Sequence, residues 1–130
     1  FTEFLKSYNR GQVSVNVIKP GAVKGNHWHH TKNEKFLVVS GSGVIRLKNL
    51  QEENVVEYLI SGEKPEVVDI PVGTVHHIEN SGDKDMVIII WGSELFDKET
   101  PDTYFSEIEL TLKETENEKV ESNDRCRYAS

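Results

Sequence analysis

The sequence has little cysteine and no long hydrophobic run. Cys126 is the only cysteine among the 130 residues, so no disulfide can form within the chain, and a reducing compartment, the cytoplasm, is the expected location. No apolar run approaches the roughly 18 residues of a membrane span, and no signal-peptide pattern opens the chain, so no membrane association is expected. The formal net charge is −7, which argues against a nucleic-acid partner.

The chain also lacks a convincing helical pattern. Short runs rich in β-branched and apolar residues recur at close spacing and are separated by turns that contain glycine or proline. The predicted strands are 12–19, the segment around His27 and His29, 36–39, 44–47, 55–60, 66–70, 75–80 and 86–91. Some eight short strands in a chain of this length predict one all-β domain, a sandwich or a barrel.

The two ends of this series need separate predictions. In the first strand Val13, Val15 and Val17 alternate with Ser14 and Asn16, which predicts a half-buried strand. After the last strand, the polar stretch 93–104 is expected to wrap over the barrel, and 107–112 alternates again as a final strand. Residues 113–130 have almost no apolar side chains and are expected to be a disordered polar tail. The predicted domain is therefore 1–112.

Histidine and glutamate gather in two stretches. His27 and His29 lie one residue apart and so share a face of an extended strand. Glu34 can return to that face after a short turn, and His76 follows a Pro-x-Gly turn later in the chain. Three imidazoles and a carboxylate favour Zn, Fe, Mn, Ni or Cu over Mg or Ca. The alternative interpretation is that these are solvent-facing or hydrogen-bonded polar residues without a metal.

The spacing of these residues resembles the two motifs of the cupin family. The matching stretches are Gly25-x-His27-x-His29-x4-Glu34-x6-Gly41 and Pro71-x-Gly73-x2-His76-x3-Asn80, with the leading glycine closer to the first histidine than usual. The resemblance implies an antiparallel jelly-roll β-barrel. It also implies one divalent metal held by His27, His29, Glu34 and His76, with zinc expected and iron, manganese and nickel as alternatives.

Longer stretches resemble one cupin group more closely. Residues 11–16, 24–41, 67–73 and 101–105 are similar to the C-terminal cupin domain of the CapF/WbjC-type capsular polysaccharide synthesis enzymes. Those bifunctional enzymes act on the route to UDP-N-acetyl-L-fucosamine, with an N-terminal NADPH-dependent reductase domain. The resemblance implies that the cupin domain is a C3-epimerase of a UDP-2-acetamido-2,6-dideoxy-4-keto-hexose, acting through deprotonation next to the ketone.

The resemblance also implies partners. The chain has no glycine-rich dinucleotide fingerprint, so the reductase is expected as a fused or separate domain. The small substrate is a UDP-linked keto sugar. A homodimer is expected by analogy, because the edge strands of such a barrel would otherwise be unprotected.

Epimerisation needs a stabilised enolate, a base and an acid. The candidates for these roles are His30, His77, Lys35 and Tyr104, with Lys32 also available. His30 and His77 each follow an inward-facing histidine, so they face the other side unless a bulge or a strand end intervenes. Each of these side chains is also a plausible surface residue.

Three other side chains have alternative roles. Arg46 could bind a pyrophosphate, although exposure on the barrel wall is the more common role for such a residue. Trp28 and Trp91 are expected in the core or in a dimer interface rather than as sugar-stacking platforms.

Two other functions remain open from the sequence. The first is a non-catalytic, metal-stabilised module for sugar-nucleotide binding or dimerisation, which would bind the sugar nucleotide without proton exchange. The second, less favoured, is an iron-dependent oxygenase, which would consume oxygen when Fe(II) is added.

Overall fold

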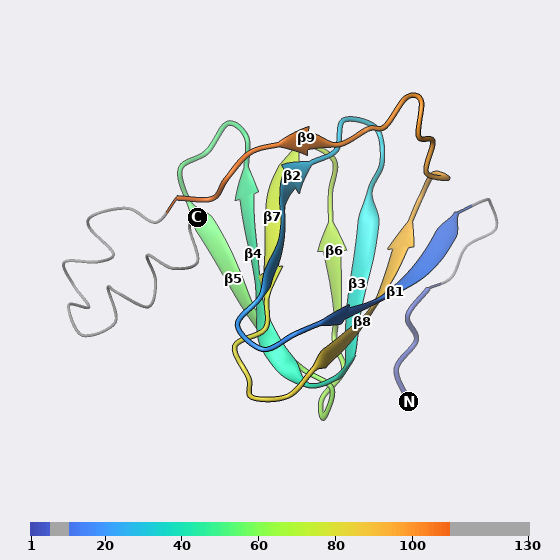
Figure 1. The fold of residues 1–130 in the computed structure, drawn as a ribbon. Coiled ribbons are helices and arrows are strands. Elements are labelled where there is room, and N and C mark those ends of the chain that lie inside the picture. Colours follow the sequence, from blue (N-terminus) through green and yellow to red (C-terminus); the bar gives the residue numbers. More distant parts are fainter. Residues whose placement is uncertain (6–10, 110–130) are drawn as a thin grey trace.

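The computed structural model describes residues 1–5 and 11–109, and this part of the chain contains strands and no helix (Figure 1). The strands are β1 Gln12–Ile18, β2 Val23–Trp28, β3 Glu34–Ser40, β4 Ser42–Asn49, β5 Val55–Ser61, β6 Val67–Ile70, β7 Thr74–Glu79, β8 Met86–Gly92 and β9 Tyr104–Phe105. Nothing in the described ranges forms a helix long and apolar enough to cross a membrane. The predicted tail 113–130 lies outside the described residues.

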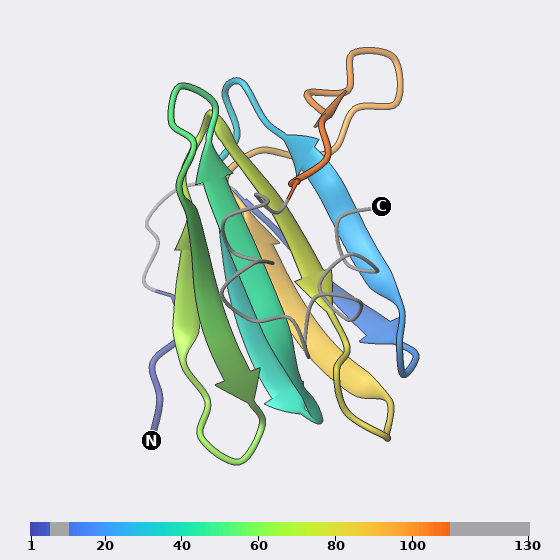
Figure 2. The same ribbon diagram turned by 90° about the vertical axis from the view of Figure 1, so that its left-hand side faces the viewer.

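The strands form two antiparallel sheets that face each other (Figure 2). One sheet has the order β1-β8-β3-β6 and the other β5-β4-β7-β2-β9. Consecutive strands therefore alternate between the sheets over most of the chain, as in a jelly roll. The prediction of an all-β, antiparallel jelly-roll fold of the cupin type is confirmed.

The core lies between the two sheets, where the inward faces of the strands meet. Ile45, Met86 and Ile88 are completely buried there, and Ile18 and Ile70 are 1 % exposed. Each alternates along its strand with a residue of the opposite face, as the two-residue period of a strand requires. Burial of this aliphatic set supplies the main stabilising term of the fold.

The end of the domain differs from the sequence-based prediction. The stretch after β8 does return to the barrel, but it pairs through β9, where His27 is opposite Phe105 and Trp28 is opposite Tyr104. Residues 107–109 form no strand, and the rest of the predicted strand 107–112 lies outside the described residues. A pairing of two residues leaves no periodic signal in the sequence, which explains why it was not predicted.

Strand β1 turns its polar side chains inward and its valines outward. Val13, Val15 and Val17 are 60 %, 62 % and 48 % exposed, while Ser14 and Asn16 line a cavity between the sheets. A valine face normally packs on the core. Here Ser14 and Asn16 add polar groups to a cavity wall that also includes Ile18, Ile88 and Ile90.

Candidate metal centre

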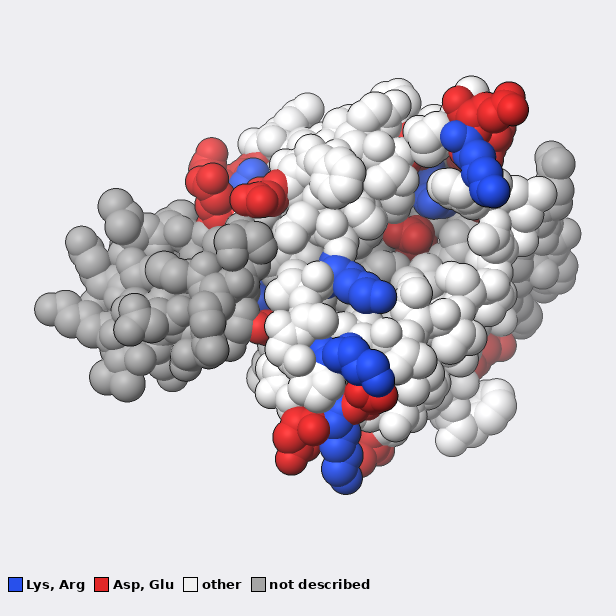
Figure 3. Space-filling view, in the orientation of Figure 1, with Lys and Arg blue, Asp and Glu red and all other residues white. Residues whose placement is uncertain are grey.

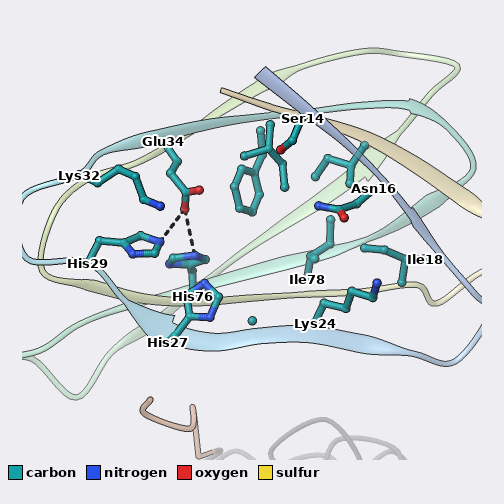
Figure 4. Close-up of a pocket in the computed structure, with 14 residues that line it drawn as sticks. Ser14, Asn16, Ile18, Lys24, His27, His29, Lys32, Glu34, His76 and Ile78 are labelled. Carbon is teal, nitrogen blue, oxygen red and sulfur yellow. Dashed lines mark hydrogen bonds and ion pairs between the residues drawn. The ribbon is translucent and has the colours of Figure 1, made fainter. Parts of the chain in front are cut away.

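Four side chains converge in the barrel interior, as the two motifs predict. His27 lies on β2, Glu34 begins β3, His76 lies on β7, and His29 follows the end of β2. One ligand atom from each residue lies within 4.8 Å of the ligand atoms of the other three. Figure 4 shows the three imidazoles and the carboxylate pointing toward one another. This cluster could hold a metal ion.

A β-bulge in β2 aims His27 at the cluster. The register with β7 shifts between Gly25, opposite His77, and His27, opposite His76. Gly25 has φ 114° and Asn26 has φ 58°, so both residues lie in the positive-φ region that bulges use. Because of this extra residue, Lys24 and His27 line the same cavity although they are three positions apart.

We predict that Gly25→Ala will strongly destabilise the domain. A Cβ at Gly25 would lie 2.7 Å from the backbone oxygen of His76 and 2.9 Å from the Cα of His77, so β7 would have to move. We expect a loss of about 3 kcal/mol in the free energy of unfolding, measured by denaturant titration. The matched control is Gly21→Ala, because Gly21 has φ +80° but nothing within 4 Å of its Cβ position. Equal losses in the two variants would contradict the proposed clash.

Two of the histidines are held in one tautomer by backbone carbonyls. His29 Nδ1 lies 2.6 Å from the carbonyl oxygen of Asp102, and His76 Nδ1 lies 3.1 Å from that of Thr74. A carbonyl can only accept a hydrogen bond, so each Nδ1 carries the proton. Metal-bound histidines are commonly fixed in this way by a second hydrogen bond.

The donor set fits a cation at its centre. In the neutral rings, Nε2 of His29 and of His76 presents a lone pair toward Glu34 Oε1, at 2.9 and 3.3 Å. The carboxylate oxygen also offers only lone pairs, so a proton or a metal ion is needed between them. His76 Nε2 is also buried, and no residue in the described part of the chain gives it a hydrogen bond of good geometry. Such an atom is expected where a ligand bond replaces the hydrogen bond.

The electrostatics of the cluster favour the metal-binding forms of His27 and Glu34. Burial lowers the pKa of His27 to about 4, and the neighbouring His76 and His29 add to this effect. Burial raises the pKa of Glu34, but the adjacent imidazoles of His29 and His76 outweigh this effect and hold the pKa well below its usual range. A neutral imidazole and an ionised carboxylate are the forms that bind metals.

A carboxylate from the end of the domain orders the loop between His29 and Glu34. Asp102 accepts hydrogen bonds from the backbone amides of His30, Thr31 and Lys32 at 2.8–2.9 Å. Burial raises the pKa of Asp102, but these donors bring it down to about 2. The side chain and the backbone oxygen of Asp102 thus hold the loop and the His29 ring together.

The cluster opens into a cavity of about 470 Å³ between the sheets, which is a usual size for a small-molecule site. Besides the ligands, Ser14, Asn16, Lys24 and Lys32 are the polar side chains that line it. Of these four, only Lys32 was considered as a functional residue from the sequence. The inward Ser14 and Asn16 were visible in the alternation of β1, but a valine face gives no sign that it lies outside.

The four predicted catalytic residues do not line this cavity. His30 is exposed and lies beside Trp28, with ring centroids 6.4 Å apart. Lys35 forms a salt bridge with Asp69 on the outer face of β3. Tyr104 is 45 % exposed. His30 lies beyond the end of β2 and is exposed, whereas Lys32, two residues further along the chain, lines the cavity.

His77 is buried on the opposite face of β7 from His76. Its Nε2 accepts from Arg46 Nη1 at 3.2 Å, so Nδ1 donates to Asn26 Oδ1 at 2.9 Å. Burial and the Arg46 guanidinium lower the pKa of His77 to about 4. Arg46 is itself buried and bonded to Glu57 and Glu79, contrary to the expectation of an exposed arginine. This network stabilises the sheet and anchors the bulge at Asn26.

The two tryptophans lie on β2 and β8. Trp28 stacks on Tyr104 with ring centroids 4.6 Å apart, and this contact fixes β9 on β2. Trp91 is partly buried on β8. Neither residue lines the cavity.

Comparison with known proteins identifies relatives of this chain. Residues 1–104 match the polysaccharide biosynthesis C-terminal domain family. The chain is 42 % identical over 104 residues to UDP-2-acetamido-2,6-beta-L-arabino-hexul-4-ose reductase of Pseudomonas aeruginosa, covering 80 % of this chain and 28 % of the reductase. It therefore spans under a third of that relative.

Solved structures agree with this result. The capsular polysaccharide assembling protein CapF of Staphylococcus aureus is 65 % identical, with a TM-score of 0.75 over 77 % of this chain and 27 % of CapF. The dTDP-4-dehydrorhamnose 3,5-epimerase of Elizabethkingia anophelis shares only the fold, at 17 % identity and a TM-score of 0.61 over 71 % of this chain and 53 % of that one. The chain belongs to the polysaccharide biosynthesis C-terminal domain family and is a cupin domain of the CapF type.

Proposed function

We propose that this domain is a metal-assisted C3-epimerase of a UDP-linked 2-acetamido-2,6-dideoxy-4-keto-hexose in capsular polysaccharide synthesis. The observation that carries the proposal is the cluster of His27, His29, Glu34 and His76 at the base of a cavity of about 470 Å³. The name of the Pseudomonas relative supplies the substrate class, a UDP-linked 4-keto sugar. The reductase step belongs to another domain, fused or separate, because this chain matches only 28 % of that relative.

The chemistry requires stabilisation of negative charge next to the reacting carbon. Removal of the C3 proton leaves an enolate whose charge lies largely on the C4 oxygen, and a proton returned to the other face of C3 completes the inversion. A divalent metal bound by the four ligands, zinc by preference, would supply a Lewis acid for that oxygen. Lys32 extends into the cavity beside Glu34 (Figure 4), and its ammonium adds a second positive charge there.

The test is exchange at C3 in heavy water. Purified domain with added zinc is incubated with the UDP-linked 4-keto sugar, and deuterium at C3 is followed by NMR. We expect incorporation together with the C3-inverted product. Binding of the sugar nucleotide without any exchange would favour the non-catalytic module instead, and oxygen uptake dependent on Fe(II) would favour the oxygenase.

We also propose that the chain forms a homodimer through the outer face of β1. Val13, Val15 and Val17 are exposed on this edge strand, and an exposed β-branched edge is a surface that proteins usually cover.

For this surface we predict that Val15→Lys will convert the dimer to a monomer, because a charge would have to be buried in an apolar contact. Light scattering should change from about twice the 14.8 kDa chain mass to the chain mass. The control is Val56→Lys, a valine 49 % exposed on the other sheet. A monomeric wild-type chain would remove the proposal, and dissociation by Val56→Lys alone would move the interface to β5.

A further inference from the structure

We propose that Lys24, with Asn16 and Ser14 opposite it, holds the diphosphate of a sugar nucleotide. The sugar would then lie over the cluster of three histidines and Glu34. This inference rests on the proposed function and adds the binding position of the nucleotide part of the substrate. The residues come from two strands that are adjacent in sequence but lie in different sheets, β1 and β2. Figure 4 shows Ser14 and Asn16 on one side of the cavity and Lys24 on the other, away from Lys32 and Glu34.

The two strands expose their polar side chains to the cavity at a structural cost. β1 turns Ser14 and Asn16 inward and leaves Val15 62 % exposed, which reverses the arrangement that hydrophobic burial favours. β2 brings Lys24 to the same cavity as His27 only through the bulge at Gly25, where no Cβ fits. Both features are explained if this end of the cavity binds a polar, charged ligand.

The charge of the cavity is opposite to that of the chain. Among residues 1–5 and 11–109, the lysines that line it are Lys24 and Lys32 and the only carboxylate is Glu34. The charged side chains of this described lining therefore sum to one positive charge before any metal is bound. The chain as a whole carries −7. Figure 3 shows lysine or arginine side chains on both sides of a hollow in this face of the molecule. A positive site on an acidic protein concentrates an anion in the cavity.

Lys24 is available for such an anion. In the described part of the chain no ion pair or hydrogen bond of its ammonium is present, whereas Lys19 and Lys35 are paired with Asp85 and Asp69. A smaller cavity of about 170 Å³ adjoins the cluster on another side. It includes Glu94 among its lining residues, and this carboxylate would repel a diphosphate. The end of the cavity at Lys24 is therefore the favoured position for the phosphates.

The experiment compares Lys24→Gln with Lys64→Gln, which removes a lysine 88 % exposed outside the cavity. UDP binding is measured by calorimetry, with uridine and inorganic pyrophosphate as further probes, and KM and kcat are measured for C3 exchange. Lys24→Gln should weaken UDP binding and raise KM by about 10-fold, with kcat and metal content nearly unchanged. Asn16→Val should also raise KM, as Lys24→Gln does. Uridine, which lacks the phosphates, should not bind measurably.

The outcomes separate this inference from the proposed function. Unchanged UDP affinity and KM in Lys24→Gln, with exchange intact, would overturn the diphosphate site and leave the epimerase standing. Lys24-dependent UDP binding without exchange in the wild type would support the site and remove the epimerase. If pyrophosphate binds as tightly as UDP and with the same dependence on Lys24, the site recognises the phosphates. If pyrophosphate binding instead ignores Lys24, the phosphates bind elsewhere, for example on the metal, and the proposal fails.

Discussion

His76→Ala is expected to remove the metal and to abolish C3 exchange. His76 Nε2 is buried next to Glu34, and the described residues offer it no other partner, so the loss of this ring would leave three of the four candidate ligands. Removal of an outer-shell partner alone typically weakens metal binding by about 10- to 100-fold, so loss of a ligand should exceed that range. Metal content by mass spectrometry and exchange by NMR are the two measurements.

The matched control for this variant is His30→Ala. His30 is exposed and lies close in sequence to the ligands, but its ring does not line the cavity. We expect full metal content and exchange within about twofold of the wild type, as for surface substitutions in general. Metal retained in His76→Ala would mean that the ligand set is wrong. Loss of exchange in His30→Ala with metal in place would restore His30 as a catalytic candidate.

Lys32→Gln is expected to lower kcat for exchange by about 10²–10³-fold, the effect of removing one group that stabilises a developing oxyanion. Lys32 lines the cavity beside the cluster, whereas glutamine keeps its approximate size and loses the charge. Metal content should stay at the wild-type level, because the lysine is not among the four ligands. Steady-state kinetics with a metal assay on the same sample measure both quantities.

Lys35→Gln is the control for this second prediction. Lys35 follows Glu34 directly but forms its salt bridge with Asp69 on the outer face of β3, so its removal should leave kcat unchanged. A large loss in Lys35→Gln and none in Lys32→Gln would reverse the assignment. Equal small losses in both variants would leave the metal as the main source of enolate stabilisation.

Much of the fold could be predicted from the sequence because its strands are short, apolar and separated by strong turn signals. The apolar runs 36–38 and 86–91 indicate buried strands directly. The pairing of Trp28 with Tyr104 could not be predicted, because two residues have no period. The orientation of β1 also depends on the distant strands that enclose the cavity, and local alternation carries no information about which face they cover.

The sequence predicts the four cluster residues better than it predicts the catalytic residues. The four cluster residues follow from motif spacing, and the structure brings all four together. The catalytic candidates rest only on residue type near these motifs, and proximity in sequence is a poor guide in a strand because neighbours face opposite sides. Lys24 shows the reverse effect, since the bulge at Gly25 returns it to the inner face.

The position of Asp102 in the chain has a consequence for how the proposed metal would be acquired. Asp102 orders the loop 30–32 and holds the His29 ring, yet it comes after all four cluster residues in the order of synthesis. During translation the ligands therefore emerge before the residue that orients one of them. We expect metal loading to be a late step of biosynthesis that follows the docking of the segment around Asp102, and metal release from the finished protein to require that segment to detach first.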